Sequence, residues 1–279
     1  MSKRALFVHA HPDDETINNG ATMAQMVEDG VAVTLVTCTR GEEGEVLVPE
    51  LAHLASSAED KLGIHRITEL ANAMKELGVK DHRFLGEYRD SGMMGTPQNE
   101  HPNCFWRADV ELAAKELAAI IDEVKPQVMV TYDENGGYGH PDHIQTHRVA
   151  MRAAEIANWQ IKKIYWNIMP KSVVQKGMDA MKDQGSDFFG AENVDDLPFV
   201  KDDSFVDAVI HAPNQVDKKM AAMKAHATQI SLDGPFFALS NNLGVQVFGD
   251  EYYTLVKGVK AAVASTDNLE QDLFAGIEI

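Results

Sequence analysis

Short apolar runs alternate with helix-like segments through the first 170 residues of the chain. A short run of branched apolar residues is typical of a strand, and apolar residues spaced by three and four are typical of a helix. This alternation favours a Rossmann-like α/β fold, in which helices cover both faces of a mostly parallel sheet. We expect strands at 5–8, 31–37, 82–85, 127–131 and 163–167, and helices at 20–28, 57–77 (with Ser57 as N-cap), 109–124 and 144–157.

The common doubly wound arrangement predicts which strand ends lie together. Its strand order is 3-2-1-4-5, so the first and fourth strands are neighbours and the topology reverses between them. A ligand crevice opens there, beyond the carboxyl ends of the strands. Side chains that follow 5–8 and 127–131 should therefore meet, although they are far apart in the chain.

Histidine and aspartate side chains follow both of these strand ends. The segment His11–Glu15 (HPDDE) follows the first strand, and His140–His143 (HPDH) follows the fourth. A catalytic zinc ion takes three protein ligands and keeps one position for water. We interpret His11, Asp14 and His143 as these three ligands.

Four further side chains in the same region are candidate catalytic residues. Asp13 would hold the water and take its proton. His140, separated from His143 by a proline that disfavours a helix, would stabilise the oxyanion or protonate the leaving amine. Asp142 would hydrogen-bond an imidazole and set its tautomer. Tyr138, between glycines in a loop, would close over the substrate carbonyl.

The other histidines have simpler interpretations. His147 lies four residues after His143, the spacing of zinc proteases, but Ile144 stands where such enzymes have a catalytic glutamate. We therefore expect His147 to be structural. His9 points to the opposite side of its strand from its neighbours, and we expect it to be packed. No site role is expected for His53, His65, His82, His101, His211 and His226.

A length of 279 residues allows one large domain, or one domain with an addition. We expect a catalytic core at 1–170 and a smaller C-terminal α/β portion at 171–279, which would pack on the core and help to shape the substrate cleft. Helices are expected at 171–182 and 217–227. The segment 192–207 carries six acidic side chains against one lysine, which favours an exposed linker over a lid.

Net charge and cysteine content limit the partners and the compartment. The formal net charge of -18 would repel nucleic acid and anionic membranes, and it is compatible with a small neutral or cationic substrate. No signal peptide and no apolar run of about 20 residues is visible. Cys38 and Cys104 are too few for a disulfide framework and are expected to be buried thiols. We therefore expect a cytoplasmic protein; the sequence does not indicate an oligomeric state.

The two histidine–aspartate segments together resemble the signature of the LmbE/PIG-L family of zinc-dependent N-deacetylases. Members of this family remove an acetyl group from N-acetylglucosaminyl compounds on a Rossmann-like fold, and the resemblance extends over most of the chain. Four further segments resemble the actinobacterial mycothiol branch of the family. They are Gly41–Glu45, Arg89–Met93, Ala225–Gln229 and Ala238–Asn242.

The resemblance implies a role for each matching residue. It implies one Zn²⁺ per chain, with Fe²⁺ as an alternative, held by His11, Asp14 and His143. It implies that Asp13 acts as the general base and then as the acid that returns the proton to the amine. Tyr138 and His140 would polarise the acetyl oxygen, and Asp142 would tune His140. The positions that match binders of the sugar and inositol hydroxyls are Glu45, Arg66 and Asp90.

The mycothiol branch contains two activities that the resemblance helps to separate. One enzyme deacetylates GlcNAc-inositol, and the other cleaves the corresponding amide of mycothiol S-conjugates. The conjugate amidases carry a lysine where this chain has Asn18, and Ser240–Asn242 is also similar to the deacetylases. We expect hydrolysis of GlcNAc-inositol to GlcN-inositol and acetate. The alternatives are a conjugate amidase or another LmbE-type GlcNAc deacetylase.

A chemically distant alternative is a non-haem iron oxygenase, whose facial triad also has two histidines and one carboxylate. His11 and Asp13 have the H-x-D spacing of such a triad. Those oxygenases usually need a β-rich barrel, whereas this chain alternates strands with helices. A nicotinamide-binding fold is not indicated, because no G-x-G-x-x-G follows the first strand.

Overall fold

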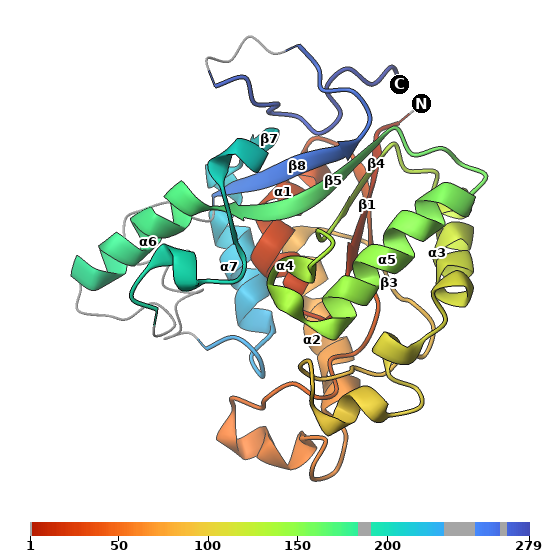
Figure 1. Ribbon diagram of the computed structural model, residues 1–279, viewed down its shortest axis with the longest axis vertical. Coiled ribbons are helices and arrows are strands. Elements are labelled where there is room, and N and C mark those ends of the chain that lie inside the picture. Colours follow the sequence, from red (N-terminus) through yellow and green to blue (C-terminus); the bar gives the residue numbers. More distant parts are fainter. Residues whose placement is uncertain (1, 184–190, 232–248, 263–266) are drawn as a thin grey trace.

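A mostly parallel sheet forms the centre of the molecule (Figure 1). The computed structural model describes residues 2–183, 191–231, 249–262 and 267–279. The strands lie in the order β3-β2-β1-β4-β5-β8-β7, and β6 pairs with β5. The parallel order from β3 to β5 confirms the predicted α/β arrangement. The strands are β1 (Arg4–His9), β2 (Ala32–Thr37), β3 (Asp81–Phe84), β4 (Val128–Thr131), β5 (Lys163–Pro170), β6 (Val200–Lys201), β7 (Ala208–His211) and β8 (Asp250–Lys257).

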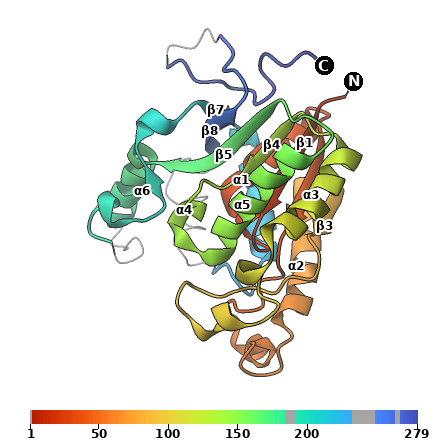
Figure 2. The same cartoon turned by 45° about the vertical axis from the view of Figure 1, so that its right-hand side comes forward.

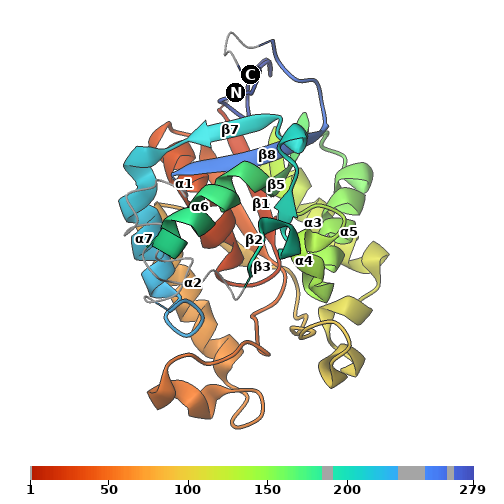
Figure 3. The ribbon, with the colours of Figure 1, turned by 60° about the vertical axis from the view of Figure 1, so that its left-hand side comes forward.

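Helices cover both faces of this sheet. The helices are α1 (Asp14–Glu28), α2 (Leu62–Leu77), α3 (Val110–Val124), α4 (Gly136–Gly139), α5 (Pro141–Ile156), α6 (Lys171–Asp183) and α7 (Val216–Ala225). Figure 3 shows α1, α2 and α7 on one side of the sheet and α3 and α5 on the other, and Figure 2 shows α3 and α5 in front of it. Short 3₁₀ turns lie at Pro49–Leu54, Pro97–Glu100, Phe105–Arg107, Val194–Asp196, Asp203–Phe205 and Pro213–Gln215.

The pleat of β1 explains why both faces need a cover. Ala5 and Phe7 pack into the apolar core beneath α1 and α2. Leu6 and Val8 point the other way, into the core beneath α3 and α5. Because successive side chains of a strand alternate between faces, a strand that is apolar throughout must be buried on both sides.

Helix α1 begins at Asp14, earlier than the predicted 20–28. Its first turns look polar in the sequence, but their polar groups have protein partners. Asn19 is buried, and its Oδ1 lies 2.8 Å from Nε2 of His9. Carboxylates in the first turn also interact favourably with the partial positive charge of a helix N-terminus. The apolar pattern therefore begins later than the helix does.

Two other predicted helix starts were wrong. Helix α5 begins at Pro141, where a proline was expected to oppose a helix. At the first helical position proline lacks only an N–H that has no partner there, and its φ suits the helix. Helix α2 begins at Leu62, and Lys61 rather than Ser57 precedes it. The Asp60 N–H instead donates to the Ala55 carbonyl, 3.0 Å away, and closes a turn before the helix.

The C-terminal portion continues the same sheet. Strand β8 pairs antiparallel with both β5 and β7, and α7 packs against α1 and α2. Helices α6 and α7 match the predicted 171–182 and 217–227 closely, whereas β6, β7 and β8 were not predicted. Within the described residues, no helix is both long and apolar enough to span a bilayer.

The acidic segment 192–207 is more than a linker. Most of its acidic side chains are exposed, as predicted. However, Val194 and Leu197 are buried in a small apolar cluster with Val174 and Met178 of α6. The predicted exposure is therefore confirmed for most of the acidic side chains, while apolar residues between them anchor the segment to the fold.

Candidate metal centre and active site

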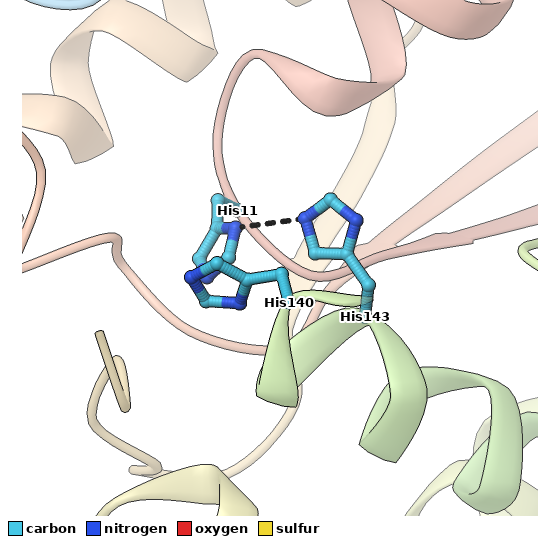
Figure 4. Close-up of side chains that lie close together, drawn as sticks. All are labelled: His11, His140 and His143. Atoms are coloured by element: carbon cyan, nitrogen blue, oxygen red, sulfur yellow. Dashed lines mark hydrogen bonds between the residues drawn. The ribbon is translucent and has the colours of Figure 1, made fainter. Parts of the chain in front are cut away.

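The two histidine–aspartate segments meet at the carboxyl ends of β1 and β4, which are neighbouring strands. Nδ1 of His11 lies 3.3 Å from Nε2 of His143. Oδ2 of Asp14 lies 3.4 Å from each of these two nitrogens. The ring of His140 lies beside both histidines, as Figure 4 shows. The structure thus brings together the three residues that the sequence suggests as metal ligands.

Hydrogen bonds on the far side of each ring indicate which nitrogen is free. Nε2 of His11 lies 3.2 Å from Oδ2 of Asp142, an acceptor that requires the hydrogen to be on this nitrogen. Nδ1 of His143 lies 3.1 Å from the Gly136 carbonyl oxygen, which has the same requirement. In neutral rings, the lone pairs of His11 Nδ1 and His143 Nε2 then face each other beside the Asp14 carboxylate. This donor set suits a cation between them.

The electrostatics of the buried centre also favour positive charge. Burial opposes ionisation of His11, but Asp90 and the hydrogen bonds to Asp14 and Asp142 hold the pKa of His11 well above its usual value. Burial likewise opposes ionisation of Asp14, yet His143 and His11 hold the pKa of Asp14 well below its usual range. Fixed carboxylates around these rings therefore stabilise a positive charge at this point.

Two other sets of side chains in the described residues are close enough to share an ion. One is His11 with His140 and His143, and the other is His11 with Asp90 and Asp142. Nδ1 of His140 already accepts a hydrogen bond from the Asp142 N–H at 3.2 Å. Both Asp142 and Asp90 lie on the Nε2 side of His11, at 3.2 and 3.6 Å.

Asp13 precedes the proposed ligand Asp14 in the chain, and its carboxylate contacts Arg66. Its φ of 121° lies outside the regions that L-residues favour, which costs on the order of 1–3 kcal/mol. Nη2 of Arg66 donates to Oδ2 of Asp13 at 2.9 Å, and the Asp13 side chain is 17% exposed. Burial raises the pKa of Asp13 to about 6, against the opposite effect of Arg66. Asp13 is thus a reachable carboxylate in a strained position.

Arg66 is bound to the protein rather than open to a ligand. Arg66 is only 2% exposed. Its guanidinium donates to the carbonyls of Gly41 and Pro12 as well as to the Asp13 carboxylate. Gly41 has a φ of 66°, and a Cβ there would lie 1.8 Å from Nη1 of Arg66. The close approach of the glycine backbone therefore helps to hold the guanidinium in place.

The other two residues predicted to bind hydroxyl groups have different surroundings. Asp90 is 4% exposed and accepts from the N–H groups of Glu43 and Gly92, at 3.1 and 2.8 Å. The Glu45 side chain is exposed, and the Glu45 backbone carbonyl accepts from Nε2 of Gln229 at 3.0 Å. Glu43, whose N–H binds Asp90, lines an open cavity of about 470 Å³ together with Asp60, Arg89, Pro97, Gln98, Glu100 and His101.

His140 caps helix α5 and faces the donor cluster. Burial, then the neighbouring His11 and His143 rings, lower the pKa of His140 to about 3. Since its Nδ1 accepts a backbone N–H, the hydrogen of the neutral ring is on Nε2. Tyr138 lies on α4 with its ring 5.0 Å from that of His143, and it is 41% exposed.

Asp142 does not contact His140 through its carboxylate, contrary to the role that the resemblance implies. Its Oδ2 faces His11, and it also accepts from the N–H of Ser91 at 2.9 Å. Its Oδ1 accepts from the Ser91 hydroxyl. Asp142 is fully buried, and its hydrogen bond to Nε2 of His11 is of the kind that sets the tautomer of a ring.

His9 and His147 are packed, as expected. His9 is buried between Asn19 and Tyr132, and Nδ1 of His147 lies 3.0 Å from the Tyr132 carbonyl. Tyr132 was not singled out in the sequence. Its ring stacks on His143 with 4.4 Å between centroids, and it supports that donor from behind.

Three further supporting residues were missed at the sequence level: Ser91, Glu15 and His226. Glu15 and His226 are fully buried, and Oε1 of Glu15 lies 2.9 Å from Nε2 of His226. Ser91 and His226 lie in the segments Arg89–Met93 and Ala225–Gln229, which resemble the mycothiol branch. That resemblance was the available signal, since spacing alone did not connect them to the site.

Asn18 and Ser240–Asn242 are the positions at which the sequence resembles the deacetylases rather than the amidases. Asn18 lies on α1, and its Nδ2 donates to the Asp14 carbonyl at 2.9 Å. Ser240–Asn242 lies outside the described residues.

Relatives of this chain match all or nearly all of its length, and a family model matches its N-terminal half. Residues 6–154 match the family described as PIG-L: GlcNAc-PI de-N-acetylase. A 1D-myo-inositol 2-acetamido-2-deoxy-alpha-D-glucopyranoside deacetylase from Geodermatophilus obscurus is 56% identical over 99% of this chain and 98% of its own length. A protein of the same name, numbered 1, from Catenulispora acidiphila is 55% identical, over 100% of this chain and 90% of its own length.

A solved structure shows the same fold at low sequence identity. The N,N'-diacetylchitobiose deacetylase from Pyrococcus horikoshii has a TM-score of 0.58 and 20% identity, covering 95% of this chain and 88% of that one. At this identity the similarity establishes the fold alone. The family match over residues 6–154 and the relatives that are more than half identical show that the chain belongs to the PIG-L family of N-deacetylating hydrolases.

Proposed function

We propose that this protein is a zinc-dependent deacetylase that hydrolyses the N-acetyl amide of GlcNAc-inositol to GlcN-inositol and acetate, a step of mycothiol biosynthesis. The observation that carries the proposal is the donor triangle of His11, Asp14 and His143, with edges of 3.3 and 3.4 Å, beside a reachable Asp13. The full-length relatives that bear the name of this activity support the substrate.

The donor triangle fits one zinc ion. Tetrahedral bonds of about 2.0–2.1 Å separate neighbouring ligand atoms by about 3.4 Å, which agrees with the observed edges. When bound, such an ion supplies Lewis acidity that polarises the amide carbonyl and acidifies water. We propose Zn²⁺ at one ion per chain, with Fe²⁺ as an alternative occupant, because imidazole and carboxylate ligands suit both.

Asp13 is proposed as the general base and then the general acid. Its raised pKa of about 6 suits a group that takes a proton from the attacking water and later returns it to the leaving nitrogen. Arg66 holds the carboxylate through Oδ2, which leaves Oδ1 for the proton transfer. Arg66 is therefore proposed to orient Asp13 rather than to bind the substrate directly.

His140 and Tyr138 are proposed to stabilise the acetyl oxygen. The Nε2–H of His140 is available as a donor because Nδ1 is already hydrogen-bonded to the backbone. The Tyr138 hydroxyl belongs to a side chain that is partly exposed and lies beside His143. Donors directed at a developing oxyanion lower the barrier of acyl transfer.

Asp90 and Glu45 are proposed to contact the sugar and inositol hydroxyls. The Glu45 side chain is exposed, and Asp90 is buried 3.6 Å from Nε2 of His11. The net charge of -18 is consistent with an uncharged amino-sugar substrate and disfavours nucleic acid or an anionic membrane as partner. Two buried, unpaired thiols, Cys38 and Cys104, support a cytoplasmic location.

The experiment is parallel turnover of GlcNAc-inositol and a mycothiol S-conjugate, with bound metal measured on the same samples. The proposal expects zinc near one equivalent and a clear preference for GlcNAc-inositol. A preference for the conjugate would place the protein among the amidases, and no hydrolysis of either amide by the metal-loaded protein would contradict the proposal.

A further inference from the structure

The backbone of Asp13 is held from one side by Glu15. Asp13 has a φ of 121°, and its N–H donates to Oε2 of Glu15 at 2.9 Å. A non-glycine residue keeps such a conformation only when its surroundings impose it. The Glu15 carboxylate is therefore one of the groups that determine where the Asp13 side chain points.

Glu15 is in turn held by a histidine from the far end of the chain. His226 follows α7, which packs on α1 and α2, and its Nε2 lies 2.9 Å from Oε1 of Glu15. The Thr16 hydroxyl donates to the same oxygen at 2.6 Å. Both members of the pair are fully buried, so water does not replace the contact.

Within the described residues, the other ring nitrogen of His226 has no hydrogen-bond partner that would compete with Glu15. Nδ1 is buried without a hydrogen-bond partner in the described part of the chain. A buried imidazole with one unsatisfied nitrogen is costly to keep, and the side-chain hydrogen bond that His226 makes in the described part of the structure is with Glu15. Packing alone would be served better by an apolar side chain of similar volume.

The two sides of Asp13 are thus held separately. Arg66 binds the carboxylate Oδ2 and the preceding Pro12 carbonyl. Glu15 binds the N–H, and His226 fixes Glu15. The second support crosses 211 sequence positions and comes from the C-terminal portion.

We propose that His226 is a positioning residue for the reaction: it fixes Glu15, which holds the strained Asp13 backbone so that the Asp13 carboxylate faces the metal donors. The inference rests on the proposed function, because it matters for turnover only if Asp13 transfers the proton. It predicts that loss of the contact slows the chemical step and leaves the metal and substrate sites intact.

The test uses two matched substitutions in the zinc-loaded, full-length protein. In His226→Gln the side-chain amide reaches the place of Nε2 and keeps the bond to Glu15. In His226→Asn the amide reaches only the place of Nδ1 and loses that bond. His211→Asn serves as control, since His211 forms an exposed pair with Asp250, at 2.9 Å, on the sheet edge.

We expect His226→Asn to lower kcat per bound zinc by about 10- to 100-fold, because small displacements of a reacting group cost this much. KM for GlcNAc-inositol should change less than about threefold, and His226→Gln should restore most of kcat. The control should keep wild-type kcat. Equal kcat per zinc in His226→Asn and wild type would overturn the inference, and so would a change confined to KM or to bound zinc.

A double-mutant cycle with Asp13→Asn separates this inference from the proposed function. If His226 acts through Asp13, adding His226→Asn to Asp13→Asn should change kcat little further. Full additivity would show a role independent of Asp13 and overturn the inference alone. Wild-type turnover by Asp13→Asn would overturn both proposals. Should His226→Asn fail to fold, Glu15→Met tests the same support, because it removes both the contact with His226 and the bond to the Asp13 N–H; it is expected to lower kcat per zinc at least as much, and wild-type kcat in this variant would overturn the inference.

Discussion

The segments His11–Glu15 and His140–His143 share the order His-Pro-Asp, yet they fold differently. In the first, the aspartate, Asp13, precedes helix α1 with a φ of 121° and forms no side-chain cap. In the second, the histidine, His140, precedes helix α5 with a φ of -63° and accepts the Asp142 N–H. The same three residue types therefore give a strained helix start in one segment and a regular one in the other.

The difference separates two uses of an aspartate beside a metal centre. Asp13 is partly exposed and held in its strained position by Arg66 and Glu15, which suits a group that must reach water. Asp142 is fully buried and accepts from Ser91 and His11, which suits a group that only orients a ring. Strain is present where chemistry is proposed and absent where support is proposed.

Removal of a proposed metal ligand should have the largest effect. Asp14→Ala and His143→Ala each leave two nitrogen or oxygen donors, too few for a site that keeps an open position. We expect bound zinc and turnover to fall to background in both, measured by elemental analysis and acetate release. His147→Ala should retain the metal, and retention of zinc by both ligand variants would contradict the assignment.

Asp13→Asn should have the next largest effect and should separate the two aspartates most clearly. We expect zinc to stay bound while turnover of GlcNAc-inositol falls by about 10²- to 10⁴-fold, the usual contribution of a general base. Initial-rate measurements on metal-assayed protein check this. A loss of zinc parallel to the loss of rate would mean that Asp13 serves the metal instead.

Asp142→Asn should weaken the metal site rather than remove the chemistry. The asparagine amide accepts the hydrogen bond from the His11 Nε2–H less well than the carboxylate does. Loss of a group that orients a metal ligand in this way usually costs about 10- to 100-fold in metal affinity or activity. We expect competition with a chelator to reveal a weaker zinc complex, with activity largely recovered at saturating zinc. Activity that stays low at full zinc occupancy would give Asp142 a direct part in the reaction.

The smallest expected effect is on the free energy of unfolding, and it measures the backbone strain at Asp13. Replacing Asp13 by Ala or Gly removes the same contacts, but glycine tolerates a φ of 121°. We expect the free energy of unfolding of Asp13→Gly to be about 1 kcal/mol higher than that of Asp13→Ala. Asp142 lies in the first turn of helix α5, where the order should reverse: Asp142→Ala should have a free energy of unfolding about 0.5–1 kcal/mol higher than that of Asp142→Gly. Denaturant unfolding of the four metal-free variants tests this; the same order at both positions would argue against strain at Asp13.

The sequence was sufficient to predict how the N-terminal strands are arranged and where the two segments meet. Strands β1 and β4 are apolar throughout, and alternation with helices leaves few arrangements for them. The helix starts were less predictable, since Asn19 looks exposed in a sequence but has buried partners, and since Pro141 suits a first helical position.

The supporting residues were the least predictable part of the site. His226 contacts Glu15 only because α7 packs on α1, and no periodicity in the sequence encodes that long-range contact. Arg66 was expected to face the substrate, yet its guanidinium is bound to Asp13 and to backbone carbonyls. The positive φ of Asp13, which makes both supports necessary, has no signature in the residue types.

Anomalous diffraction from crystals of the zinc-loaded protein tests the proposed centre most directly. The donor triangle predicts one ion at about 2.0–2.2 Å from His11 Nδ1, His143 Nε2 and Asp14 Oδ2, with Asp142 still bound to the other nitrogen of His11. An ion coordinated by His140 in place of Asp14, or by Asp90 and Asp142 on the Nε2 side of His11, would contradict it.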